Sequence, residues 1–175
     1  MGIYQFEGRV PRLGRGTFVF ETATVIGEVV IGEDVYIGPG AVVRGDYGTI
    51  IVGDRTSVEE NVVIHARPGE KTIIGNDVTL GHGCVVHGCT IEDKAIIGMG
   101  AVVSDYAHIG EWGVVAEGAV VRNKGMVEPR TVVAGVPAKS IKTVDEDFIK
   151  LWIYFKSVYP DLAKRYPGGL KRIDG

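Results

Sequence analysis

The stretch IEDKAIIGMGAVVSDYAHIGEWGVVAEGAVV, residues 91–121, decides the fold because an aliphatic residue returns in it at every sixth position. These residues are Ile91, Ile97, Val103, Ile109, Val115 and Val121. A small residue, such as Ala95 or Ala101, tends to stand four places after each of them. A six-residue period is typical of a parallel β-helix, in which each hexad forms a short strand and a corner, with its aliphatic residue pointing into the core.

The same period extends toward the N-terminus in three further runs. They are Val25, Ile31, Ile37 and Val43, then Val52, Val58 and Ile64, then Ile74, Leu80 and Val86. Interruptions from Gly45 to Ile51 and from Arg67 to Ile73 separate the runs, and we expect a loop at each. A β-sandwich is the alternative, but its strands alternate with period two and its turns are spaced irregularly. The sequence therefore predicts an all-β solenoid in which three hexads close one triangular coil and coils stack ~4.8 Å apart.

The C-terminal residues leave this period and predict a helix. Thr143-Val-Asp-Glu146 matches a capping box, and the apolar residues after it recur at helical spacing. We expect Pro160 to kink or split this helix, and Pro167-Gly168-Gly169 to end it. The predicted organisation is a β-helix domain over residues 1–142 and a helical segment over residues 143–175, packed on a flat side of the coils.

Composition excludes several classes of protein. The chain has 175 residues, enough for one domain with a sizeable core, and a formal net charge of -3 with scattered Lys and Arg, which argues against nucleic acid as a partner. No run approaches the ~18 apolar residues of a membrane span, and the N-terminus lacks a signal-peptide pattern. The two cysteines, Cys84 and Cys89, are too few for a disulfide framework. A cytoplasmic, reduced location is the expectation.

Two of the four histidines fall at the same place in adjacent coils. With Val43 on the first side of the triangle, Ile64 and Val86 also start first-side hexads, and His65 and His87 follow them directly. We expect them to stack on one edge at about 5 Å, close enough to share a metal, with Arg44 one coil earlier. Three imidazoles and a water are the arrangement of a catalytic zinc.

His82 points from a different edge. It belongs to the third-side hexad of Leu80, as Glu59 belongs to that of Val58, so it cannot easily meet His65 and His87 within one chain. It can meet them if the third-side edge of one subunit faces the first-side edge of the next. A heterologous contact of this kind closes into a ring, and a triangular prism predicts a homotrimer with one site per interface.

Three segments carry a family resemblance. VVRGD at residues 42–46, ENVVIH at 60–65 and LGHGCVVHGC at 80–89 resemble the γ-class carbonic anhydrase family; the segment 133–139, VAGVPAK, is shared with hexapeptide acyltransferases. The resemblance implies a left-handed β-helix and a homotrimer. It also implies a Zn²⁺, Fe²⁺ or Co²⁺ ion held by His65 and His87 of one subunit and His82 of the next. The implied reaction is reversible hydration of CO2 to bicarbonate, with metal-bound hydroxide as the nucleophile.

The resemblance also implies catalytic residues. Arg44 and Asp46 match a pair that spans the subunit interface, and Tyr159 resembles a C-terminal tyrosine near the site. Glu59 stands where the family usually has Gln, and as a carboxylate it could orient or deprotonate the water. The family's acidic loop with its proton-shuttling Glu is missing, and Glu70 is a weak substitute.

Two other functions stay open. One is a hexapeptide acyltransferase that binds CoA between coils and uses a histidine as general base. The other is a metal-binding family member with little or no anhydrase activity, which the short loops permit. Cys84 takes an inward place and is expected in the core, and His108 is expected at the surface.

Overall fold

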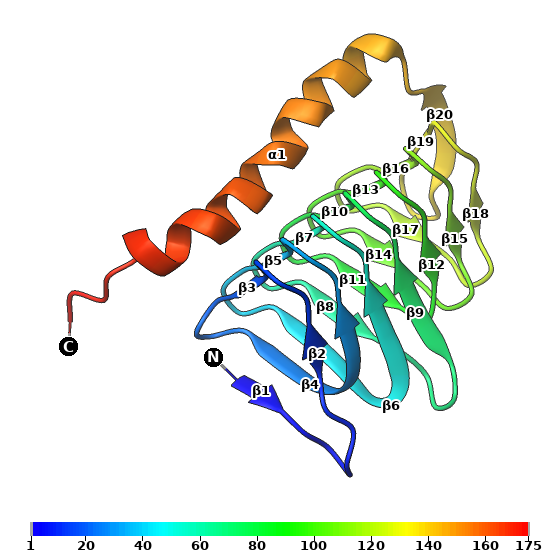
Figure 1. Ribbon diagram of the computed structural model, residues 1–175. Helices are drawn as coiled ribbons and strands as arrows, with labels where there is room; N and C mark the ends of the chain where they lie inside the picture. Colours follow the sequence, from blue (N-terminus) through cyan, green and yellow to red (C-terminus); the bar gives the residue numbers. More distant parts are fainter. Residues whose placement is uncertain (1, 175) are drawn as a thin grey trace.

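The chain winds into a left-handed parallel β-helix, which the computed structural model describes over residues 2–174 (Figure 1). The first side contains β1 (Gly2–Tyr4), β8 (Val63–His65), β11 (Val85–His87), β14 (Val102–Val103) and β17 (Val120–Val121). The second contains β2 (Arg12–Leu13), β9 (Lys71–Ile74), β12 (Thr90–Ile91), β15 (His108–Ile109) and β18 (Met126–Val127). The third contains β3 (Phe18–Val19), β5 (Tyr36–Ile37), β7 (Ser57–Val58), β10 (Thr79–Leu80), β13 (Ile96–Ile97), β16 (Val114–Val115) and β19 (Thr131–Ala134). Two long strands, β4 (Thr24–Ile31) and β6 (Val42–Val52), pass from the first side to the second.

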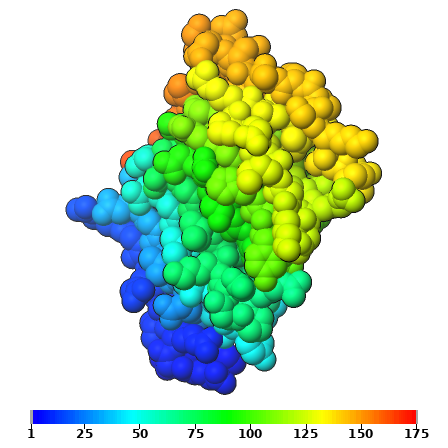
Figure 2. Space-filling view, turned by 90° about the vertical axis from the view of Figure 1, so that its right-hand side faces the viewer, coloured from blue at the N-terminus to red at the C-terminus, as the bar shows by residue number. Residues whose placement is uncertain are grey.

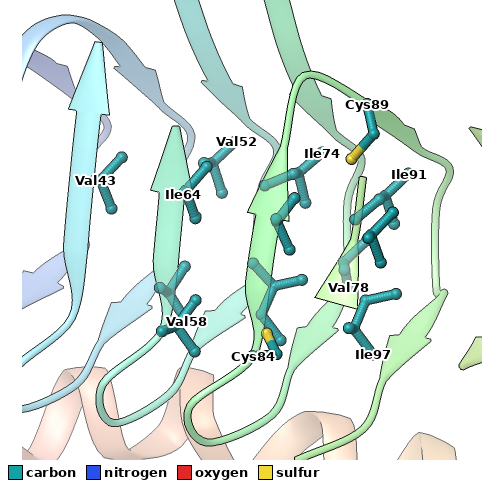
Figure 3. Close-up of a cluster of buried hydrophobic side chains, with 14 of the residues drawn as sticks. Val43, Val52, Val58, Ile64, Ile74, Val78, Cys84, Cys89, Ile91 and Ile97 are labelled. Carbon is teal, nitrogen blue, oxygen red and sulfur yellow. The ribbon is translucent and has the colours of Figure 1, made fainter. Parts of the chain in front are cut away.

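The strand register confirms the predicted coil of three hexads. On the first side Val43 pairs with Ile64, and Ile64 with Val86. On the third side Val58 pairs with Leu80 in the same way. These side chains are fully buried and meet along the axis of the prism (Figure 3). Each buried aliphatic side chain contributes roughly 1.5–3 kcal/mol, so the repeat itself supplies most of the core.

The first predicted interruption is a strand, and the expectation of a loop there is wrong. β6 runs unbroken across residues 45–51, because its backbone pairs with β4 on one side and with β8 and β9 on the other. β4 pairs with Gly45 and again from Ile50 onward, so residues 46–49 bulge opposite the irregularity between Gly27 and Val29, and Thr49 pairs with Lys71 of β9 instead. The second interruption does contain a loop, at residues 66–70 between β8 and β9.

Many corners of the prism turn through a residue in the left-handed conformation. At the corner between the second and third sides, Arg55, Asp77 and Lys94 have φ of 54°, 53° and 61°. This conformation costs a non-glycine residue about 1–2 kcal/mol. The ladder offsets that cost, because backbone bonds join successive corners, as from Asp77 N to Asp54 O and from Lys94 N to Asn76 O, both 2.8 Å.

After β19 the chain reverses into β20 (Lys139–Thr143), which is antiparallel to β19, and then enters α1 (Glu146–Gly169). The N-cap of the helix is Asp145, whose Oδ1 accepts a 2.8 Å hydrogen bond from Phe148 N. The sequence-based cap at Thr143 is wrong, because Thr143 is still paired in β20 with Thr131. Pro160 does not split α1, which ends at Gly169 as expected.

The helix packs along the third side, antiparallel to the direction in which the coils stack (Figure 1). Figure 2 shows another face, on which the coils follow one another from the N-terminal residues at the bottom to the C-terminal residues at the top. Near its start Ile149 joins a buried cluster with Ile96, Trp112, Val114, Val132 and Val144. Near its end Tyr166 stacks on Phe18, with ring centroids 5.1 Å apart. Within residues 2–174, no helix, α1 included, is long and apolar enough to cross a membrane.

Candidate functional site

The ends of β6, β8 and β11 bring Arg44, His65 and His87 into one row, which we call the histidine edge. Arg44 pairs with His65, and His65 with His87, as the sequence predicts. Because the two histidines are in register on adjacent strands, their rings lie side by side with centroids 5.0 Å apart. His65 Nδ1 and His87 Nε2 face each other at 3.0 Å.

The other two ring nitrogens each contact a carboxylate. His65 Nε2 lies 2.9 Å from Asp46 Oδ1, and His87 Nδ1 lies 2.5 Å from Asp105 Oδ1. Each carboxylate is also held by an arginine, since Arg44 contacts Asp46 and Arg67 Nη2 donates to Asp105 Oδ2 at 2.7 Å. Two Arg–Asp–His chains therefore run toward the same point between the rings.

Both carboxylates of these chains are held in the ionised form. Burial acts to raise the pKa of Asp46, but its hydrogen bonds with His65 and Arg44 outweigh this and hold the pKa below its ordinary value. For Asp105 the hydrogen bond from Arg67 is the main cause, and the pKa is again lowered. An ionised carboxylate is purely an acceptor, so it favours a proton on the imidazole nitrogen that faces it.

His82 lies on the third side, between two other carboxylates. Its Nε2 is 3.1 Å from Glu59 Oε2 and its Nδ1 is 2.5 Å from Glu60 Oε2. Its side chain is 45% exposed, more than those of His65 and His87 at 18% and 32%. Within residues 2–174 of a single chain, no group of three or more His, Cys, Asp or Glu residues is placed to hold a metal ion. His82 thus stands apart from the histidine edge, as its register indicates.

Glu59 and Tyr159 meet beside His82. Glu59 is 4% exposed, and burial raises its pKa while the neighbouring His82 opposes that rise. Tyr159, from α1, hydrogen-bonds Glu59, and burial together with Glu59 and Glu60 raises the pKa of its hydroxyl. The predicted proximity of Tyr159 to this site is therefore found, although its catalytic role is a prediction.

The donor set of the histidine edge fits a metal ion. Two imidazole nitrogens at 2.0–2.1 Å from a tetrahedral zinc are separated by about 3.3 Å, close to the spacing of His65 Nδ1 and His87 Nε2. Metal-bound histidines almost always donate their other N–H to a carboxylate or carbonyl, and Asp46 and Asp105 occupy that role here. The pair supplies two ligands, so a third must come from elsewhere.

An apolar groove of about 750 Å³ begins at His82 and runs between the third side and α1. We call it the helix groove. It is lined by Glu59, His82, Ile96, Val114, Val132, Phe148, Trp152, Phe155 and Tyr159. Its polar lining includes Glu59 and His82 and also Glu117 and Lys142, and aromatic side chains of α1 contribute to the wall.

Sequence reasoning missed Asp105, Glu60 and the role of Arg67. Asp105 stands two places after Val103, whereas the residue that continues the row one coil beyond His87 is Ser104, so the row by itself does not predict Asp105. Arg67 lies on the loop of residues 66–70, whose shape the period does not predict. Arg44 and Asp46 pair within one chain, and a pairing across subunits remains a prediction.

The remaining candidates lie outside the site. Cys84 is fully buried in the core, as predicted, and burial raises its thiol pKa to about 12. His108 is at the surface, paired through Nε2 with Glu92 Oε1 at 2.7 Å. Glu70 is exposed at the end of the loop of residues 66–70.

Comparison with protein families and curated proteins identifies relatives over nearly the whole chain. The family described as "Bacterial transferase hexapeptide (six repeats)" matches residues 11–45 and 71–105. The carnitine operon protein CaiE of Escherichia fergusonii is 37% identical over 166 residues, which cover 94% of this chain and 84% of CaiE.

Solved structures repeat the same architecture. A hexapeptide transferase family protein from Anaplasma phagocytophilum has a TM-score of 0.90 at 33% identity, and the match covers 94% of this chain and 98% of that chain. A Bacillus cereus protein described as a candidate acetyltransferase has a TM-score of 0.92 at 32% identity, covering 94% and 95%. The Bacillus cereus N-acyltransferase AntD, solved with coenzyme A, is 15% identical with a TM-score of 0.67, and this likeness concerns the fold alone.

Proposed function

The chain belongs to the hexapeptide-repeat transferase family, and within that family we propose that it is a metal-dependent enzyme that hydrates CO2 to bicarbonate between subunits. One observation carries the proposal. His65 and His87 turn one nitrogen each toward the other, while the carboxylates of Asp46 and Asp105 face the outer nitrogens. Acyl transfer with a single histidine as general base leaves this convergence unexplained.

The metal would be Zn²⁺, with Fe²⁺ or Co²⁺ as alternatives, held by His65 Nδ1, His87 Nε2 and a nitrogen of His82 from a neighbouring subunit. When bound, such an ion lowers the pKa of water toward about 7 and so supplies hydroxide at neutral pH. The chain's own part is to present neutral imidazoles. Because Asp46 and Asp105 are ionised, the proton of each ring stays on the outer nitrogen and the inner nitrogen is free to donate its electron pair.

A homotrimer would complete the site. The first-side edge of one subunit would meet the third-side edge of the next, so that each interface combines His65 and His87 with one His82. In the single chain both nitrogens of His82 face carboxylates. One of them must turn from its carboxylate to the metal, and the other keeps a carboxylate partner, as metal-bound histidines do.

Glu59, Tyr159, Arg44 and Asp46 would serve the reaction around this centre. Glu59 lies against His82 and takes a hydrogen bond from Tyr159, so its carboxylate is fixed where it can accept the proton of an attacking water. Arg44 offsets the charge of Asp46 and keeps that carboxylate directed at His65.

The test is CO2 hydration by stopped flow on protein purified without oxygen and with its metal quantified. We expect about one metal ion per chain, because a closed trimer has as many interfaces as chains and each interface would hold one site. His82→Ala should lose the metal although His65 and His87 remain. The matched control is His108→Ala, which removes another histidine paired to a carboxylate and should keep the metal. Metal without measurable hydration would favour a binding protein, and metal-free wild-type protein would contradict the proposal.

Complementation tests the trimer directly. Neither His82→Ala nor the double variant His65→Ala, His87→Ala has a complete site as a homotrimer. In a mixed trimer, the intact histidine edge of the first variant meets the intact His82 of the second. About one site in three should regain metal if the site lies between subunits of a closed ring. No recovery on mixing would place all ligands in one chain and overturn the assembly.

Acyl transfer from coenzyme A is the second candidate, and the helix groove favours it. A His–carboxylate pair, His82 with Glu59, lies at the mouth of an apolar groove of about 750 Å³, far more space than CO2 needs. The Bacillus cereus relative is described as a candidate acetyltransferase. If this function is correct, metal-free protein should bind coenzyme A and transfer an acetyl group, and His82→Ala should abolish the transfer.

A further inference from the structure

Two hydrogen-bonded Arg–Asp–His series converge on the site, and the sequence analysis predicts the residues of only one of them. The first is Arg44–Asp46–His65, whose members stand close together in β6 and β8. The second is Arg67–Asp105–His87, assembled from three separate coil segments. Asp105 is 9% exposed, although aspartate is almost never buried without a partner.

Asp105 is fixed from both sides. Its Oδ1 is 2.5 Å from His87 Nδ1, and its Oδ2 accepts from Arg67 Nη2 at 2.7 Å. Space for the carboxylate exists because residue 88 is glycine: a Cβ there would lie 2.4 Å from Asp105 Oδ1. Gly88 also has φ of +58°, where glycine is favoured. The residue after the histidine is therefore matched to a carboxylate from the next coil.

The four charged groups of the two chains balance. Arg44 and Arg67 offset Asp46 and Asp105, so the cluster is formally neutral when both imidazoles are neutral. Arg67 holds the second oxygen of Asp105, so the first oxygen stays directed at the His87 ring.

We propose that Asp105, held by Arg67, is a positioning residue that fixes the His87 ring with Nδ1 protonated and Nε2 directed at the metal. The proposal rests on the proposed metal function. Asp105 touches neither substrate nor metal and acts through His87. An alternative is that the Arg67–Asp105 pair only ties the loop of residues 66–70 to the next coil, which would affect stability without affecting the ring.

The ring itself gives a readout that needs no metal. In ¹⁵N imidazole spectra of metal-free protein, we expect His87 as the Nδ1–H tautomer in wild type, and a changed spectrum in Asp105→Asn. The matched control is Glu92→Gln, which alters a similar carboxylate–histidine pair at His108 and should leave the His87 signals unchanged. An Nε2–H tautomer in wild type, or the same His87 spectrum in Asp105→Asn, overturns the proposal.

Metal affinity is the second readout. By competition with a chromophoric zinc chelator, Asp105→Asn should bind zinc 10–100-fold more weakly, and Glu92→Gln should match wild type. If Asp105→Asn does not fold, Arg67→Met tests the same contact, since Arg67 is 54% exposed on its side chain and its replacement should be tolerated. Unchanged affinity in both variants sinks the proposal. Wild-type protein that binds no zinc contradicts the proposed function instead, and the metal-free spectra still decide whether Asp105 sets the ring.

Discussion

The histidine edge and the helix groove belong to one solenoid but are built on different principles. At the histidine edge, ladder pairing sets the spacing of His65 and His87, and carboxylates with arginine partners fix the rings. The helix groove depends on α1, which is laid against the third side by packing. His82, at its mouth, is more exposed than either ring of the histidine edge. The histidine edge presents two metal-ligand candidates, His65 and His87, from one chain. The helix groove presents one, His82, toward the outside of the chain.

This difference suggests that, in a site shared between subunits, one region sets the ligand geometry and the other makes the contact with the neighbour. The region that must hold precise geometry is formed by backbone hydrogen bonds, which one chain makes alone. The region that would meet a neighbour leaves apolar side chains exposed. Leu151, Tyr154 and Phe155 of α1 are 55%, 66% and 45% exposed. Isolated exposed apolar residues need no explanation, but a row of them along one helix marks a surface suited to contact.

The largest expected effect comes from breaking the histidine edge at Gly88. Alanine there pays for a left-handed backbone, about 1–2 kcal/mol, and for the overlap with Asp105 Oδ1 at 2.4 Å, about 1–3 kcal/mol more. Gly118→Ala is the matched control, because Gly118 has a similar φ of +65° and open space around its Cβ. Urea unfolding should show a loss of about 2–5 kcal/mol for Gly88→Ala and only the backbone part for Gly118→Ala. Equal losses would mean that the Asp105 carboxylate is not held against residue 88.

A smaller effect is expected from pH at the helix side. Lys156 Nζ, on α1, donates to Asp77 O at 2.8 Å and to Thr79 Oγ1 and Ala95 O at 3.2 Å. Burial lowers its pKa to about 7, opposed by the charges of Asp77 and Glu59. The folded pKa lies below the unfolded value of 10.5, so the unfolded chain binds more protons between these limits and the free energy of unfolding rises with pH across that window.

The measurement is urea unfolding of wild type and Lys156→Met at pH 7 and pH 9. Over these two pH units we expect the Lys156 contribution to grow by on the order of 1–2 kcal/mol, so that wild type gains more stability than the variant. The comparison of the two proteins cancels the titration of other groups. Cys84 and Cys89, whose thiol pKa values are raised by burial, act at higher pH and in the opposite direction. A parallel pH dependence in both proteins would show that the ammonium is not desolvated under α1.

The histidine edge could be predicted because the strand register of a solenoid follows from counting residues in the six-residue period. Once the six-residue period is known, His65 and His87 must be neighbours, and Arg44 must precede them. The same arithmetic failed at residues 45–51, where a change of period was taken for a loop. The extra residues instead bulge within β6, which pairs with β4 on both sides of the bulge and with β9 from Thr49 onward. The sequence period shows where residues are inserted. Whether the inserted residues stay in a strand depends on the backbone pairing with neighbouring strands.

The groups around the histidines were harder to predict for a different reason. Asp105 and Arg67 are distant in sequence and meet only through the shape of the loop of residues 66–70. Glu60 was not predicted as a site residue, yet both Glu59 and Glu60 reach His82. The position of α1 follows from side-chain packing on the third side, which no period encodes.

The smallest expected effect concerns Asp145, the N-cap of α1, at the point where the chain leaves the solenoid. Asp145 caps the helix through Oδ1 and Phe148 N at 2.8 Å, while Thr143, the cap expected from the sequence, is an exposed residue of β20. Asp145→Ala should cost about 1 kcal/mol, because the cap bond and a favourable charge at the helix N-terminus are both lost. Thr143→Ala should stay within roughly 0.5 kcal/mol, as surface substitutions usually do. Chemical unfolding followed by tryptophan fluorescence measures both, since Trp152 lies on the helix and Trp112 on the solenoid. A larger loss for Thr143→Ala than for Asp145→Ala would move the start of the helix back to the residue that the capping-box pattern indicates.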